Sequence, residues 1–215
     1  MSDPTASPRR LLLIWGICLL AVGAALGLWI FLKGATPFAV DAGWNDLLAG
    51  ARSPVLLSVS TFLNVAGGTI VGSFVVPVVG VAAFLIARRP WSAGALVIAI
   101  AASALLVQIL KNVFNRARPE EMLVISDHGS FPSGHVANAA TVAAMLVLLL
   151  PRVWTIVVAV LWVLVMAFSR TYLHAHWLSD TLGGALVGVG VALVCTGLLF
   201  ERLAPEIRRE ARSAT

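Results

Sequence analysis

The sequence predicts an all-α, polytopic membrane protein with six transmembrane helices. Hydrophobic residues make up 60% of the 215-residue chain and charged residues only 12%, against roughly 25% charged residues in an average soluble domain. A helix needs about 20 apolar residues to cross a bilayer. Six runs come close to that length: residues 11–32, about 67–87, 91–110, 134–150, 153–169 and 179–200. We therefore expect one six-helix domain over residues 11–200.

Lysine and arginine flank these runs unequally. With the N-terminus in the cytoplasm, nine fall on the cytoplasmic side: Arg9, Arg10, Arg88, Arg89, Arg152, Arg202, Arg208, Arg209 and Arg212. Six fall on the other side: Lys33, Arg52, Lys111, Arg116, Arg118 and Arg170. Because cytoplasmic loops of membrane proteins are enriched in these residues, we expect a multi-pass plasma-membrane protein with both termini in the cytoplasm.

The ends of the chain and the first connection carry weaker patterns. Residues 1–10 predict a disordered cytoplasmic N-terminus, and residues 201–215 a cytoplasmic tail that is disordered or lies on the membrane surface. The run 11–32 is too long for a signal peptide and lacks an obvious cleavage site, so we interpret it as an uncleaved span. Apolar residues at helical spacing over about 41–52 predict either a helix along the outer interface or a simple connecting helix.

Composition argues against two classes of function. The net charge of +5 comes from cations that punctuate apolar runs, so nucleic-acid binding is not expected. Cys18 and Cys195 lie inside apolar stretches and offer neither a disulfide framework nor the spacing of a metal site. The four histidines and their neighbouring carboxylates are possible zinc ligands. Because the spacing of His174 and His176 suits a strand better than a helix, we expect no metal and no other cofactor.

Polar residues cluster in three places next to the apolar runs. Lys111 ends the third run, and Arg118 follows seven residues later, so the two cations share one face if the helix continues. Pro119 then ends that helix. Two cations at a helix end are equally typical of side chains that reach back to the lipid headgroups.

The second cluster is the stretch Pro132 to His135. Pro132 and Ser133 favour a helix start, where unpaired backbone N–H groups and the positive end of the helix dipole attract an anion. Gly134 permits close approach of the backbone, and His135 titrates near neutral pH. An ordinary helix cap explains the first residues alone, but gives no reason for the histidine.

The third cluster joins the last two runs. His176 and Asp180 are four residues apart at a helix start, so their side chains can meet on one face. A carboxylate that accepts the proton of one imidazole nitrogen leaves the other nitrogen free as a nucleophile or base. Arg170 adds a planar cation suited to phosphate.

Connectivity places the three clusters at one level. The loop between the third and fourth runs and the loop between the fifth and sixth runs must emerge on the same side of the membrane, here the outer side. Three cations, a helix N-terminus and two histidines converge there, which predicts a site for a phosphate oxyanion at the outer membrane face.

These three motifs resemble those of the type 2 phosphatidic acid phosphatase superfamily of integral-membrane lipid phosphatases. They are Lys111, six residues, Arg118-Pro119; Pro132-Ser133-Gly134-His135; and Ser169-Arg170, five residues, His176, three residues, Asp180. All three match in order without a substitution. The resemblance implies hydrolysis of a terminal phosphate from a lipid phosphate or diphosphate in the bilayer, without a metal.

The resemblance also implies a role for each residue. His176 is the expected nucleophile that forms a phosphohistidine, Asp180 its orienting partner, and His135 the acid that protonates the leaving oxygen. The remaining matched residues are expected to hold the phosphoryl oxygens: Lys111, Arg118, Ser133, Gly134 and Arg170.

Several alternatives remain open at this stage. A transporter of lipid phosphate or of an anion would also place charges in the membrane, but needs no paired histidine and aspartate. Undecaprenyl diphosphate, phosphatidic acid and phosphatidylglycerol phosphate all fit as substrates, and the oligomeric state is not readable. The loop carboxylates Glu120, Glu121 and Asp127 select a headgroup, pair with Arg116 or face water. His174 is interpreted as a bystander or a hydrogen-bonding neighbour.

Overall fold

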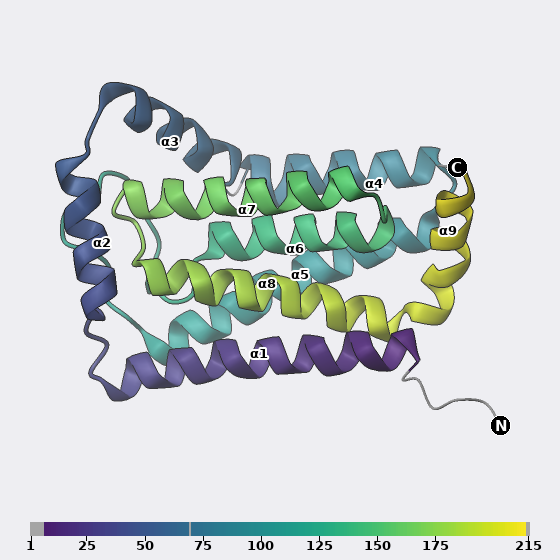
Figure 1. The fold of residues 1–215 in the computed structure, drawn as a ribbon, viewed down its shortest axis with the longest axis horizontal. Helices are drawn as coiled ribbons and strands as arrows, with labels where there is room; N and C mark the ends of the chain where they lie inside the picture. The colour runs from purple at the N-terminus through teal and green to yellow at the C-terminus, as the bar shows by residue number, and fades with distance from the viewer. Residues whose placement is uncertain (1–6, 69, 214–215) are drawn as a thin grey trace.

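The computed structural model describes residues 7–68 and 70–213, and over these residues its regular secondary structure is entirely helical, which confirms the all-α class. The elements, labelled in Figure 1, are α1 (Pro8–Leu32), α2 (Ala39–Gly50), α3 (Pro54–Ala66), a π-helical turn η1 (Val71–Val75), α4 (Val76–Ile86), α5 (Pro90–Phe114), α6 (Gly134–Leu149), α7 (Val153–Tyr172), α8 (Leu178–Leu198) and α9 (Phe200–Ser213).

Four of these helices, α1, α5, α7 and α8, are long and apolar enough to cross a membrane. The apolar helices α3, α4 and α6 are shorter, at 13, 11 and 16 residues. Large hydrophobic side chains such as Ile86 and Val153 face outward on this bundle, as lipid contact requires. The number of spans therefore stays a prediction at six, since α4 and α6 reach that role only with their flanking residues.

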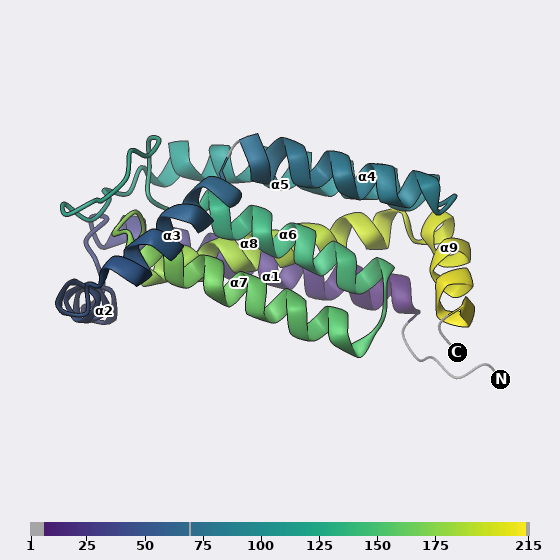
Figure 2. The same cartoon turned by 90° about the horizontal axis from the view of Figure 1, so that it is seen from above.

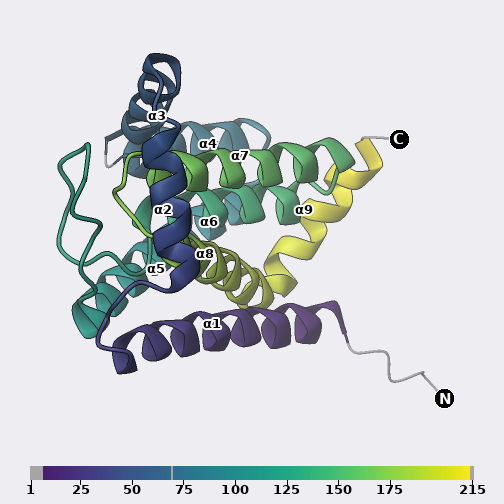
Figure 3. The same cartoon turned by 60° about the vertical axis from the view of Figure 1, so that its left-hand side comes forward.

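The long helices run side by side along the length of the molecule, and two helices close its ends (Figure 1, Figure 2). Helix α2 lies across one end and α9 across the other, and we call these the α2 end and the α9 end. Figure 3 shows α2 in front of the bundle, with the connection between α5 and α6 beside it. The predicted helix over about 41–52 is thus present, and α2 lies across the ends of the helices that carry the polar clusters.

Helix α8 is central because it packs against α1 on one side and α6 on the other. A Cβ added to Gly184 would lie 2.6 Å from the carbonyl oxygen of Ser133, and one added to Gly188 would lie 2.4 Å from that of Ala137. Only glycine permits this approach of two helix backbones. The approach holds Ser133, at the start of α6, against the first turns of α8.

The ends of the chain are more ordered than the sequence predicted. Helix α1 begins at Pro8, because the Ser7 hydroxyl accepts a hydrogen bond from the Arg10 N–H and proline suits a first helical position. Disorder through residue 10 is therefore wrong for residues 8–10, and residues 1–6 lie outside the described chain. The described tail is also helical, since Leu203 and Glu206 of α9 are buried against the bundle.

The second predicted span begins differently in the structure. A helix that the sequence did not predict, α3, precedes the glycine pair at 67 and 68, capped by the Ser53 side chain and started by Pro54. Its serine and asparagine residues interrupt the apolar run and obscured it. The chain then breaks at the two glycines and resumes through η1 into α4, so this membrane segment consists of two helical pieces.

Candidate active site

The three polar clusters meet at the α2 end, around a cavity of about 590 Å3. Five of the eight predicted site residues line it: Lys111, Gly134, His135, Arg170 and His176. The other three adjoin this wall. Arg118 contacts the His176 ring, Ser133 precedes Gly134, and the main chain of Ser133 bonds that of Asp180. The structure thus brings together all eight residues.

The hydrogen bonds of His176 define its tautomer. The ring nitrogen Nδ1 lies 2.8 Å from the carbonyl oxygen of Ser130. Because a carbonyl only accepts, Nδ1 carries the proton. The other ring nitrogen, Nε2, lies 3.1 Å from Nη1 of Arg118, and a guanidinium only donates. Nε2 therefore bears a lone pair, as a nucleophile needs.

Burial lowers the pKa of His176 well below its ordinary value, and the positive charges of Arg118 and Arg170 act in the same direction. The ring sits in the connection between α7 and α8 and is only 2% exposed. Desolvation disfavours the charged imidazolium, so this histidine is neutral at neutral pH.

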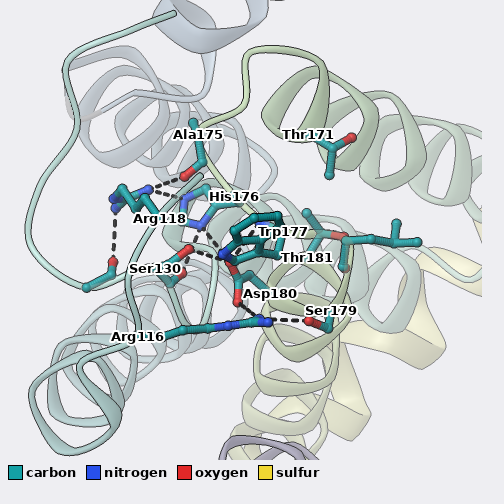
Figure 4. A network of polar contacts seen from close by, with 12 residues as sticks. Arg116, Arg118, Ser130, Thr171, Ala175, His176, Trp177, Ser179, Asp180 and Thr181 are labelled. Atoms are coloured by element: carbon teal, nitrogen blue, oxygen red, sulfur yellow. Dashed lines mark hydrogen bonds and ion pairs between the residues drawn. The ribbon is translucent and has the colours of Figure 1, made fainter. Parts of the chain in front are cut away.

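The sequence led us to expect that Asp180 accepts the His176 proton directly, but it does not. The distance from His176 Nδ1 to Asp180 Oδ2 is 3.7 Å, too long for a hydrogen bond. Ser130 links them instead, because its hydroxyl donates to Asp180 Oδ2 while its carbonyl accepts from the ring (Figure 4). The carboxylate thus orients the histidine through Ser130 and remains close enough to stabilise a positive charge on the ring.

A buried arginine that the sequence analysis did not assign to the site holds Asp180 in place. Arg116 Nη1 lies 2.6 Å from Asp180 Oδ1 and 2.8 Å from the Ser179 hydroxyl (Figure 4). Its Nη2 lies 2.8 Å from Asp41 Oδ2 of α2. All three charged side chains are fully buried. Arg116 therefore ties the helix across this end to the aspartate behind the histidine.

The sequence contains a local feature from which the position of Arg116 outside the helix could have been inferred. Helix α5 ends at Phe114, Asn115 adopts a left-handed conformation with φ 39°, and the chain continues without helix. The helix therefore stops before Arg116 and not at Pro119, where we expected it to end, so Lys111 and Arg118 do not share a helix face. The apolar run ends before Lys111, which is the signal that Arg116 and Arg118 lie outside the helix. In Figure 4 Arg118 reaches His176 while Arg116 reaches Asp180.

Two of the predicted phosphate ligands share a carboxylate. Lys111 Nζ lies 2.9 Å from Asp127 Oδ1, and Arg118 Nη2 lies 2.7 Å from the same oxygen. Burial acts to raise the pKa of the Asp127 carboxyl, but the hydrogen bond and charge of Lys111 outweigh it and lower that pKa below its ordinary value. The possibilities left open for the loop carboxylates did not include this arrangement: Asp127 pairs with Lys111 and Arg118, whereas Glu121 pairs with Arg52 and the ion pairs of Arg116 are with Asp41 and Asp180.

Helix α3 holds the third cation and the second histidine. The Asn64 side-chain oxygen accepts a hydrogen bond from Arg170 Nη1, and the Asn64 carbonyl lies 3.1 Å from His135 Nε2. Since the carbonyl only accepts, Nε2 of His135 carries a proton. Asn64 was not predicted as a site residue, because it lies in α3, a helix that the sequence did not predict.

The start of α6 offers further donors. The Ser133 hydroxyl is buried and makes no hydrogen bond within the described chain, and the same holds for Nε of Arg170. Buried donors without partners are uncommon in proteins. Beside the free N–H groups of the first turn of α6, they suit an anion with several oxygens.

Neither the remaining histidines nor a metal centre adds to this arrangement. His174 lies 2.6 Å from Asn45 of α2 through Nδ1, and His128 is exposed in the loop. Across residues 7–68 and 70–213, no three His, Cys, Asp or Glu side chains are grouped to hold a metal ion.

Comparison with known proteins adds a family to this geometry. A family model described as the PAP2 superfamily matches residues 92–204, more than half of the chain. The chain belongs to the PAP2 superfamily. The matched residues run from α5 into α9 and contain all three motifs. This is the type 2 phosphatidic acid phosphatase superfamily that the motifs predicted.

Relatives in this superfamily are phosphatases by name. Phosphatidylglycerophosphatase B of Bacillus subtilis (strain 168) is 34% identical over 151 residues, which is 64% of this chain and 72% of that protein. Lipid A 1-phosphatase of Rhizobium johnstonii is 31% identical over 134 residues, covering 54% of this chain and 53% of that protein.

Two solved structures share the fold. A transmembrane PAP2-type phosphatidylglycerolphosphate phosphatase from Bacillus subtilis superposes with a TM-score of 0.73 at 25% identity, over 86% of this chain and 96% of that one. LpxE of Aquifex aeolicus gives a TM-score of 0.64 at 27% identity, over 74% and 95%. With its four membrane-length helices, this PAP2 protein is a multi-pass membrane protein.

Proposed function

We propose that this PAP2 protein is a lipid phosphatase that removes a terminal phosphate from a lipid phosphate or diphosphate through a phosphohistidine. The observation that carries the proposal is the tautomer of His176. Its Nδ1 proton is held by the Ser130 carbonyl, and its Nε2 lone pair contacts Arg118. Lys111 and Arg170 line the same cavity as the ring.

In the first step, the Nε2 lone pair of His176 forms a bond to phosphorus and the bond from phosphorus to the leaving oxygen breaks. Fixed cations neutralise the charge that spreads over the equatorial oxygens. Arg118 Nη1, which bonds Nε2, turns to a phosphoryl oxygen. Asp180, 3.7 Å from Nδ1, stabilises the positive charge on the phosphorylated ring.

His135 supplies the proton for the leaving oxygen. It lines the same cavity as His176 and donates from its imidazolium form, which the negative charge of a bound phosphate favours, so that a neutral imidazole remains after the first step. In the second step water attacks phosphorus, the bond to His176 breaks and its electron pair returns to Nε2, and His135 takes a proton from the water. Inorganic phosphate leaves, and both histidines regain their starting states.

An apolar cavity supports a lipid as the substrate. It has a volume of about 290 Å3, lies between α6, α7 and the glycine break before η1, and shares His135 with the larger cavity. An acyl or prenyl chain placed there would bring its phosphate to the histidines. The relatives act, by name, on phosphatidylglycerophosphate and lipid A. Undecaprenyl diphosphate, phosphatidic acid and phosphatidylglycerol phosphate are the substrates we propose to compare.

We further propose that the α2 end faces the exterior of the plasma membrane and that both termini are cytoplasmic. The excess of lysine and arginine on the termini and on the connections at the α9 end supports this orientation.

The test is phosphate release by purified protein in detergent from the three lipids, with EDTA present. We expect release by the wild type and by His128→Ala, a substitution of an exposed loop histidine, and none by His176→Ala. A base-stable, acid-labile phosphoprotein should accumulate when hydrolysis is slowed. Folded wild-type protein that releases phosphate from none of the lipids would favour transport of a lipid phosphate instead.

A further inference from the structure

The Asp127 carboxylate binds Lys111 and Arg118, two of the cations that the proposed reaction assigns to phosphate. Lys111 Nζ lies 2.9 Å and 3.0 Å from its two oxygens, and Arg118 Nη2 lies 2.7 Å from one of them. Two oxygens of one anion thus bind two cations, an arrangement that two phosphoryl oxygens would also make. Lys111, Asp127 and His176 line the same cavity.

The three side chains differ in their freedom to move. Those of Lys111 and Arg118 are 3% and 8% exposed, whereas that of Asp127 is 55% exposed. The carbonyl of Gly129 lies 3.0 Å from both cations and accepts a hydrogen bond from each. The carboxylate can therefore turn into solvent while both cations keep a hydrogen bond to the Gly129 carbonyl.

We propose that Asp127 is an internal competing anion, which a substrate phosphate displaces from Lys111 and Arg118 and which thereby sets how strongly an anionic headgroup must bind to enter the site. This inference rests on the proposed function, because it assigns those cations to phosphate. A terminal phosphate carries up to two negative charges and three free oxygens, so it outcompetes one carboxylate. A phosphodiester headgroup carries one charge and two free oxygens.

A cationic site at a bilayer surface needs such a threshold. Phosphodiester lipids crowd that surface, and three uncompensated cations would bind them without turnover. A tethered carboxylate and an external anion exclude each other, so the carboxylate weakens every anionic ligand by one common factor. Ligands that bind weakly then occupy few sites at their concentration on the membrane surface, whereas ligands that bind strongly still occupy most of them.

The chain offers a matched control on the same loop. Glu121 also pairs with an arginine, Arg52, at 3.1 Å, but both side chains are exposed and neither lines the cavity. Asp127→Asn and Glu121→Gln each remove one negative charge from this loop and keep the side-chain size. Only the first frees site cations.

The test measures binding of inorganic phosphate and of dimethyl phosphate by calorimetry, in detergent and without turnover. Asp127→Asn should bind both anions more tightly by the same factor, about fivefold, which is the ratio expected for a partly exposed ion pair. Glu121→Gln should match the wild type. The Michaelis constant for the lipid substrate should fall in Asp127→Asn by a similar factor.

The sign of the change decides the proposal. If Asp127 instead orients Lys111 and Arg118 for phosphate, Asp127→Asn will bind both anions more weakly, and the proposal is overturned while turnover by the wild type leaves the proposed function intact. Equal binding by all three proteins also overturns it. Absence of phosphate binding together with absence of turnover in folded protein contradicts the proposed function itself.

Discussion

Both ends of this bundle contain buried arginines paired with carboxylates, but the charged residues have different roles at the two ends. At the α9 end, Arg89 donates to the Leu149 carbonyl at 2.7 Å and pairs with Glu210. Glu206 accepts hydrogen bonds from the N–H groups of Trp91 and Ser92 at the start of α5. The contacts to the Leu149 carbonyl and to the two N–H groups satisfy helix ends, and the ion pair with Glu210 joins α9 to the bundle.

At the α2 end only part of the charge serves packing. Arg116 is enclosed by Asp41 and Asp180, as Arg89 is by its partners. Lys111 and Arg170 instead line a cavity together with two histidines, and Arg118 contacts one of these histidines. A buried arginine with a carboxylate therefore does not identify an active site. Cations around a cavity that holds two histidines, beside a buried serine hydroxyl without a hydrogen-bond partner in the described chain, do so here.

The largest expected effect comes from Arg116, which belongs to the packing half of the α2 end. Arg116→Met leaves Asp41 and Asp180 buried without their cation, which should lower the free energy of unfolding by about 3–5 kcal/mol and abolish turnover. Arg116→Lys keeps the charge but cannot bond both carboxylates, so it should be intermediate in both. Thermal unfolding in detergent and phosphate release measure the two effects, and wild-type values for Arg116→Met would refute this account of the cluster.

Ser133→Ala should separate activity from stability. Its hydroxyl makes no hydrogen bond in the described structure, so its removal deletes no native contact and should leave the midpoint of thermal unfolding unchanged. Removal of one preorganised donor to a developing oxyanion typically costs about 100-fold in rate. A variant that loses stability but keeps its kcat would show that the hydroxyl is a helix cap and not a phosphate ligand.

The opposite outcome is expected at the α9 end. Glu206→Gln removes the negative charge that accepts three hydrogen bonds from Trp91 and Ser92. We expect a loss of about 1–2 kcal/mol in the free energy of unfolding, because a charged cap at a helix N-terminus is replaced by a neutral one. Phosphate release per folded molecule should equal that of the wild type. A selective loss of activity would show that the two ends are coupled.

The features that the sequence predicted correctly depend on local patterns of residues and on the order of the helices along the chain. The runs that became α1, α5, α6, α7 and α8 were found within a few residues, because membrane helices are continuous apolar segments with marked ends. The eight candidate residues were brought together by connectivity alone, since consecutive membrane helices alternate in direction. Both inferences need only local pattern and chain order.

What the sequence did not predict depends on distant partners. Asp41 and Arg116 are 75 residues apart, and Asn64 and Arg170 are 106 apart. No local pattern distinguishes Asp41 from an ordinary residue in the first turn of a helix, where acids are common. Ser130 lies two residues before the second cluster and was not predicted as a site residue, because its carbonyl and not its side chain contacts the histidine.

The smallest expected effect concerns the protonation of His176. Its pKa is lowered by burial and by Arg118, Arg170 and Lys111, so the neutral nucleophile should persist below pH 6.5 and the acid limb of the rate profile should lie below that value. The unfolded chain has the ordinary pKa of 6.5 and binds the proton that the folded protein excludes, so stability falls as pH drops below 6.5. One pH unit lower, the cost is at most about 1.4 kcal/mol. Thermal unfolding at pH 7.5 and 5.5 should show this loss of stability at acid pH in the wild type and a smaller loss in His176→Asn. Equal losses would mean that the ring takes up a proton in the folded protein, where Asp180 would stabilise the positive charge.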